Sequence, residues 1–94
     1  MYIDLIFDYY SKLLYIPDGY IHDVKTLQHS FLNWVSQQSE CIVLRPGNMV
    51  GYSYDENDFI EYINQVVLDN TTEKAYFVLK EKFRGKRKIY RLEF

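Results

Sequence analysis

"DVKTLQHSFLNWVSQQ", residues 23–38, is the segment whose pattern admits only one secondary structure. Its apolar side chains recur at the three- and four-residue spacing of one helix face: Val24, Leu27, Phe31, Trp34 and Val35. Asp23 stands just before this stripe, where a carboxylate accepts hydrogen bonds from the first N–H groups of a helix. We therefore expect a helix over these residues, with Trp34 largely buried at the centre of its apolar face.

Downstream, the sequence predicts a β-hairpin and then a second helix. Residues 41–54, "CIVLRPGNMVGYSY", contain two short apolar strands around a turn at 45–48, where proline and glycine hold the positions that a tight turn favours. Gly51 within the return strand indicates a bulge or a close approach to its backbone. Asp55 is the expected N-cap of the second helix, whose buried stripe is expected to contain Phe59, Ile60, Ile63, Val66 and Val67.

The C-terminal part of the chain predicts strands, whereas the N-terminal part fits two secondary structures. Residues 75–79, "AYFVL", are apolar on both faces, which is typical of a central strand. We expect them to pair with residues 89–94 in a second hairpin around Gly85, with Tyr90, Leu92 and Phe94 facing inward. Residues 2–14 fit either a helix or a strand, and the pairing of Asp8 with Lys12 slightly favours the helix.

Taken together, these segments predict an α+β fold. A chain of 94 residues has room for one hydrophobic core, so residues 1–94 should form a single compact domain. We expect two helices to cover one face of an antiparallel sheet built from the two hairpins, with the N-terminal element a helix or a strand. There is one cysteine, no long apolar run and no basic N-terminal segment typical of a signal peptide, and we expect a cytoplasmic protein without a membrane partner.

Charge is distributed unevenly along the chain. Residues 1–70 carry ten acidic and three basic side chains, whereas residues 71–94 carry three acidic and eight basic ones. Such an asymmetry favours a charged macromolecular partner, although pairing between the two regions of one molecule would also explain it. The ten tyrosines are more than a small core can bury, and tyrosine is favoured at binding surfaces.

These observations predict a non-catalytic protein-binding domain, an inhibitor or immunity-type antagonist of a macromolecular partner. We name its expected contact region the acid–tyrosine surface, made of Tyr52, Tyr54, Asp55, Glu56, Asp58 and Glu61. Carboxylates beside tyrosines suit contact with a basic protein. The alternative is that these tyrosines only cover the rims of the hairpins.

Two other functions stay open. A nucleic-acid-binding accessory protein would use the basic C-terminal residues Arg84, Lys86, Arg87, Lys88 and Arg91. We expect these side chains mostly to face solvent, because alternation with core residues in a hairpin already explains them. A self-associating regulatory or structural protein is the other alternative. No enzyme or cofactor site is predicted. A metal site is not predicted either, since His22 and His29 are too far apart along one helix to share an ion without further ligands.

Overall fold

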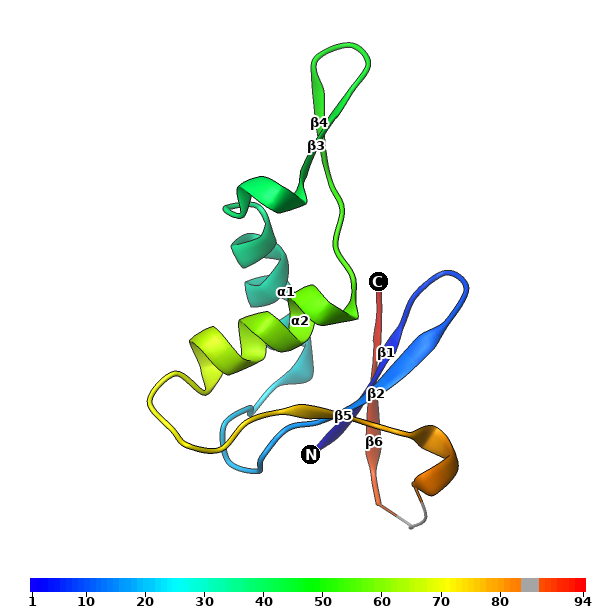
Figure 1. The fold of residues 1–94 in the computed structure, drawn as a ribbon, viewed down its shortest axis with the longest axis vertical. Coiled ribbons are helices and arrows are strands. Elements are labelled where there is room, and N and C mark those ends of the chain that lie inside the picture. Colours follow the sequence, from blue (N-terminus) through cyan, green and yellow to red (C-terminus); the bar gives the residue numbers. More distant parts are fainter. Residues whose placement is uncertain (84–86) are drawn as a thin grey trace.

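The structure, a computed structural model, describes residues 1–83 and 87–94 and has the α+β architecture predicted from the sequence. The molecule measures 49 × 33 × 19 Å (Figure 1). Its principal elements are β1 (Tyr2–Ile6), β2 (Ser11–Tyr15), α1 (Val24–Val35), β3 (Ile42–Arg45), β4 (Met49–Tyr52), α2 (Glu56–Tyr62), β5 (Tyr76–Val78) and β6 (Ile89–Glu93). The strands form two sheets, one with the order β5-β2-β1-β6 and one containing β3 and β4 only.

The N-terminal segment is a hairpin, so the slight preference for a helix was wrong. β1 and β2 pair antiparallel, with Ile3 opposite Leu14. Both of these side chains are fully buried, as is Leu5 two residues further along β1. The alternation of buried and half-buried residues in β1 therefore determined the conformation, and the Asp8–Lys12 spacing is spread across a turn instead of along a helix face.

The predicted C-terminal hairpin is also wrong. β5 pairs antiparallel with β2, and β6 pairs parallel with β1, so β5 and β6 occupy opposite edges of a mixed sheet. The N-terminal hairpin takes both central positions, and residues 75–79 contribute an edge strand instead of a central one. The turn expected around Gly85 lies outside the described residues.

The helices cover one face of the four-stranded sheet. Ile3, Leu5 and Leu92 from the sheet share one buried cluster with residues of α1 and α2. The expected alternation in β6 is confirmed, because Leu92 is buried whereas Arg91 and Glu93 on either side of it are exposed. On the other face of the sheet, Phe83 packs on Tyr2 with 4.8 Å between ring centroids.

The helix predicted over residues 23–38 is confirmed as α1. Asp23 is its N-cap and accepts from the Lys25 N–H at 3.0 Å and the Thr26 hydroxyl at 2.8 Å. Phe31, which is fully buried, holds the centre of the core and contacts five other aromatic rings. Trp34 is only partly buried at the margin of this cluster, so the expectation of a largely buried tryptophan was too strong.

The second helix begins as predicted and ends differently. Asp55 is the N-cap of α2, which continues into a π-helical turn over Ile63–Val67. In that turn the Leu68 N–H donates to the Ile63 carbonyl at 2.9 Å. The wider turn rotates the last residues, so that Val66 of the predicted stripe is exposed while Phe59 and Ile63 are buried as expected.

The predicted hairpin at residues 41–54 is confirmed, but it does not join the main sheet. β3 and β4 form an arm that projects from the body of the molecule (Figure 1). Its turn places Gly47 at φ 79° and Asn48 at φ 60°, the left-handed conformation that these two residues tolerate best. Gly51 has the predicted close approach, since a Cβ there would lie 2.5 Å from Nε of Arg45, whose side chain crosses it.

Across the part of the chain that the structure describes, neither helix has the length and apolar character needed to cross a lipid bilayer.

Candidate functional site

A hollow of about 380 Å³, here called the first hollow, lies where the turn between β1 and β2 approaches the base of the arm. Its walls are mainly aromatic and consist of Phe7, Asp8, Tyr9, Tyr10, Tyr52, Ser53, Tyr54 and Phe94. Tyr9 is 98% exposed, so its ring is available for contact with another molecule. Tyr52 and Tyr54, two residues of the predicted acid–tyrosine surface, are thus brought together with residues far away in the sequence.

The rim of this hollow includes one carboxylate that is fixed by a tyrosine. The Tyr10 hydroxyl donates to Oε2 of Glu56 at 2.7 Å, which ties the turn of the N-terminal hairpin to the first turn of α2. This hydrogen bond, together with desolvation and the nearby charges of Glu56 and Asp55, raises the pKa of Tyr10 to about 12. Tyr54 lies deeper, and burial raises the pKa of its hydroxyl as well.

The pKa of Tyr10 provides a test of this contact. Replacing Glu56 with glutamine should lower the Tyr10 pKa from about 12 toward the ordinary value of 10.0, because the neutral acceptor removes the carboxylate charge. Since the folded-state value is the higher one, the contribution of this bond to stability is complete below pH 10 and is lost as pH rises toward 12. An NMR titration of the Tyr10 ring would measure the shift. Glu61→Gln is the matched control, and an equal shift in both variants would refute the contact.

Two of the predicted carboxylates are engaged in holding the helix. The Asp55 side chain accepts from the N–H of Asn57 at 2.9 Å and of Asp58 at 3.2 Å, and the Asp55 N–H donates to Asp58 Oδ2 at 2.9 Å. Of this reciprocal capping box, the sequence predicted only the N-cap at Asp55. Burial raises the pKa of Asp58, although the bond from the Asp55 N–H acts in the opposite direction. Neutralising either residue would therefore disturb α2 as well as any binding surface.

Glu61, the last member of the predicted surface, lies apart from the first hollow. It is exposed on α2 and accepts from Nε2 of Gln65 at 3.0 Å, one turn further along the chain. The structure thus brings Tyr52 and Tyr54 to the walls and Glu56 to the rim. It assigns Asp55 and Asp58 to the cap and leaves Glu61 on the neighbouring helix surface.

The sequence did not indicate that the N-terminal hairpin contributes to this surface. Phe7, Asp8, Tyr9 and Tyr10 follow β1 directly and supply half of the lining of the first hollow. Their concentration of tyrosine beside an aspartate is the same signal that singled out "YSYDENDF" at residues 52–59. The slight preference for a helix over residues 2–14 hid it, because a turn exposes these side chains together and a helix distributes them around its axis.

The arm continues this surface with an apolar face. The register places Ile42 opposite Tyr52 and Leu44 opposite Val50, so the four side chains share one face of the hairpin. They are 40%, 45%, 82% and 56% exposed, respectively. The opposite face carries Val43, Gly51 and Met49 together with Arg45, which is the one charged side chain of the two strands. An isolated two-stranded hairpin is marginally stable in water, and such an apolar face normally packs against something.

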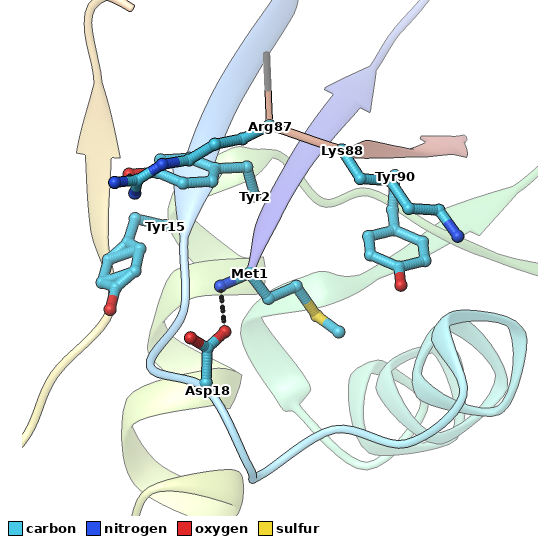
Figure 2. Close-up of a pocket in the computed structure, with 7 residues that line it drawn as sticks. All are labelled: Met1, Tyr2, Tyr15, Asp18, Arg87, Lys88 and Tyr90. Atoms are coloured by element: carbon cyan, nitrogen blue, oxygen red, sulfur yellow. Dashed lines mark hydrogen bonds and ion pairs between the residues drawn. The ribbon is translucent and has the colours of Figure 1, made fainter. Parts of the chain in front are cut away.

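A second hollow, of about 460 Å³, lies at the other end of the molecule, beside the start of β6 (Figure 2). It is lined by Met1, Tyr2, Tyr15, Asp18, Arg87, Lys88 and Tyr90. The Arg87 guanidinium lies 5.7 Å from the centroid of the Tyr2 ring, and its Nη1 donates to the Tyr2 hydroxyl at 3.1 Å. The Lys88 ammonium lies 4.6 Å from the centroid of Tyr90. Two residues of the nucleic-acid alternative therefore contact tyrosines of the same chain.

The other basic candidates are placed differently. Arg91 is exposed on the sheet face opposite the helices. The strand register places it beside Asp4 of β1, and it alternates along β6 with the buried Leu92. Arg84 and Lys86 lie outside the described residues. Arg87 and Lys88 thus both line the second hollow just before β6 begins, and Arg91 lies within β6.

Cys41 has the environment of a structural residue. It is 2% exposed at the base of the arm, and burial together with nearby carboxylates raises the pKa of its thiol. Its sulfur therefore stays protonated near neutral pH.

The two hollows and the arm offer aromatic faces, hydroxyl groups and exposed charge, which is the chemistry of binding. Comparison of the chain with protein-family models, with curated proteins and with solved structures finds no match.

Proposed function

We propose that the protein is a non-catalytic binding protein, an inhibitor or immunity-type antagonist, that holds a basic partner protein. The contact region combines the first hollow, with Glu56 and Asp8 at its rim, and the adjoining apolar face of the arm. One observation carries this proposal: Tyr52 belongs both to the arm's apolar face and to the lining of the first hollow, so the two form one continuous surface.

The composition of this surface suits a protein partner. Tyrosine gives a large contact area at a low cost in conformational entropy, and Tyr9, Tyr10 and Tyr52 are all exposed. The side chains of Leu44 and Val50 give the partner an apolar anchor, which is the usual centre of a stable interface. The carboxylates around them attract basic groups and speed association. A partner with an apolar patch surrounded by lysine and arginine is the complement of this arrangement.

The cellular compartment of this binding function is proposed from the chemistry of the single cysteine. We place this binding function in the cytoplasm, where a reducing environment suits a chain with one buried thiol at Cys41. Self-association through the arm is the competing function, supported by the same exposed apolar face. Sedimentation analysis over a range of protein concentrations separates the two, because arm-mediated self-association predicts a concentration-dependent dimer that Leu44→Ser removes.

The experiment is affinity capture from the native host, followed by measurement of binding to the purified partner. The test variant combines Asp8→Asn and Glu56→Gln, which neutralises the two carboxylates at the rim and leaves the capping box of α2 intact. We expect association to slow by roughly tenfold and to depend less on salt, because charges at the rim of an interface act mainly on the association rate.

The matched control combines Asp69→Asn and Glu81→Gln, which removes the same charge from exposed positions on other parts of the molecule. This control should bind as the unaltered protein does. Equal association rates for the test variant and the control would exclude the acidic rim as a contact. Loss of helical circular dichroism in the test variant would show a folding defect instead.

A further inference from the structure

The sheet face opposite the helices carries a row of aromatic side chains across three strands. Tyr2 pairs with Tyr15, and Tyr15 pairs with Tyr76, so the three lie side by side on one face and are named the tyrosine row. Their ring centroids are 5.2 Å and 5.0 Å apart. Tyr76, at the edge of the sheet, is 56% exposed, and Tyr2 and Tyr15 are half-buried.

Cationic side chains border one end of this row. Arg87 covers Tyr2, and both Arg87 and Lys88 line the second hollow together with Tyr15 (Figure 2). A guanidinium has five N–H donors, and within the described part of the chain Arg87 donates one hydrogen bond, to the Tyr2 hydroxyl. The other donors of Arg87 and the Lys88 ammonium make no hydrogen bond or ion pair with residues 1–83 or 87–94, and their charge suits an anionic group such as a phosphate.

Two of the acidic side chains near this face, Asp18 and Asp4, are paired with cations of the chain, whereas Glu73 accepts from the Tyr20 hydroxyl and Glu93 is exposed. Oδ1 of Asp18 lies 2.7 Å from the Met1 ammonium, which lowers the pKa of that carboxyl by hydrogen bonding and by its charge. Oδ1 of Asp4 lies 3.0 Å from the Lys80 ammonium. Of the charged side chains that line the second hollow, Arg87 and Lys88 are basic, and the acidic Asp18 is paired with the Met1 ammonium.

Proteins bind single-stranded nucleic acid by stacking bases on exposed aromatic rings while lysine and arginine contact the phosphates. We propose that the tyrosine row, together with Arg87 and Lys88, binds single-stranded nucleic acid without sequence preference. Bases stack on Tyr76 and Tyr15, and phosphates pair with Arg87 and Lys88. This binding goes beyond the proposed protein-binding function and uses different residues.

The structure overturns one of the two reasons for expecting these basic residues to be only solvated, the hairpin, and confirms the other, the alternation in β6. The hairpin depended on residues 89–94 pairing with residues 75–79, and these segments instead lie at opposite edges of the sheet. The same rearrangement brings the N-terminal tyrosines next to Arg87. The site therefore exists only in the folded sheet, which is why the spacing of residues in the sequence does not show it.

Fluorescence anisotropy with labelled oligothymidine and oligouridine tests this proposal directly. At low salt we expect saturable binding that weakens as salt increases, with a slope of about 1.4 in log–log form for two phosphate contacts. Arg87→Gln combined with Lys88→Gln should remove most of that slope. Tyr76→Leu should weaken binding about 5- to 150-fold, the range expected for losing one stacked base.

Two variants serve as controls. Phe77→Leu alters the neighbouring residue of β5, which faces the other side of the sheet, and Arg45→Gln removes a charge on the distant arm. Both should bind the oligonucleotides as the unaltered protein does. Absence of binding at low salt, or equal affinity for Tyr76→Leu and Phe77→Leu, would overturn the proposal. Polyglutamate binding as tightly as the oligonucleotides, with no loss in Tyr76→Leu, would identify this face as a site for acidic proteins and would also overturn it.

Discussion

Replacing Phe31 with alanine should lower the free energy of unfolding by about 3–5 kcal/mol, the usual cost of removing a buried aromatic ring. Phe31 is fully buried and lies within 4.9–6.2 Å, centroid to centroid, of Trp34, Tyr54, Phe59, Tyr62 and Phe94. A domain of 94 residues has a total stability of about 5–14 kcal/mol, so this single change removes a large part of it.

Urea unfolding followed by far-ultraviolet circular dichroism measures this loss without depending on the fluorescence of the adjacent Trp34. Leu32→Ala is the control, since Leu32 is the next residue of α1 and is 37% exposed. It should cost about 1 kcal/mol or less. A loss below about 1 kcal/mol for Phe31→Ala would show that α1 does not pack on the sheet as described.

Replacing Leu92 with aspartate should destabilise the protein by about 4 kcal/mol or more. Leu92 is 3% exposed and faces the core beside Leu5, its partner in the parallel pairing of β6 with β1. An unpaired carboxylate at that position has to be desolvated without a counter-charge, or else β6 has to leave the sheet. Either outcome leaves a substantial unfolded population at room temperature.

The matched control is Ile89→Asp, in the same strand on the opposite face, where Ile89 is 38% exposed. It should cost about 1 kcal/mol, since the new carboxylate stays in water. Thermal unfolding of both variants compares them directly. Similar midpoints for Leu92→Asp and Ile89→Asp would contradict the assignment of the two faces of β6.

Local patterns were enough to predict both helices and the arm. The stripe from Val24 to Val35 and the cap at Asp23 define α1 within a few neighbouring residues, and the same holds for Asp55 and α2. The turn at 45–48 needs only its own proline and glycine. In each case the signal and the structure that it predicts lie within one segment, so knowledge of the rest of the fold was unnecessary.

The order of the strands in the main sheet could not be predicted in this way. Residues 75–79 and 89–94 are consecutive strand segments, and pairing them requires a short loop, which costs little conformational entropy. They are separated because residues 2–6 and 11–15 form a hairpin whose Ile3, Leu5 and Leu14 complete the core from the middle of the sheet. The sequence of residues 2–14 fits two periods at once, and only burial against α1 and α2 distinguishes them.

In the candidate site, too, contacts between neighbours in the sequence were predictable, and contacts between distant residues were not. Tyr52, Tyr54 and Glu56 were predicted because they are neighbours in the sequence. The contact of Tyr10 with Glu56 joins residues 46 positions apart, so it depends on the hairpin that residues 2–14 were not expected to form. The same is true of Arg87 and Tyr2, which are 85 positions apart. Residue type indicated what these side chains can bind, and the sheet order determined which of them meet.

Amide hydrogen exchange, with and without the captured partner protein, tests the proposed binding surface most directly. We predict slower exchange at residues 7–10 and 42–56, where the first hollow and the arm would be covered. Residues 87–91 on the far side of the molecule should exchange at an unchanged rate. Protection of residues 87–91 by the partner protein, with none at 7–10 and 42–56, would contradict the assignment of this surface to protein binding.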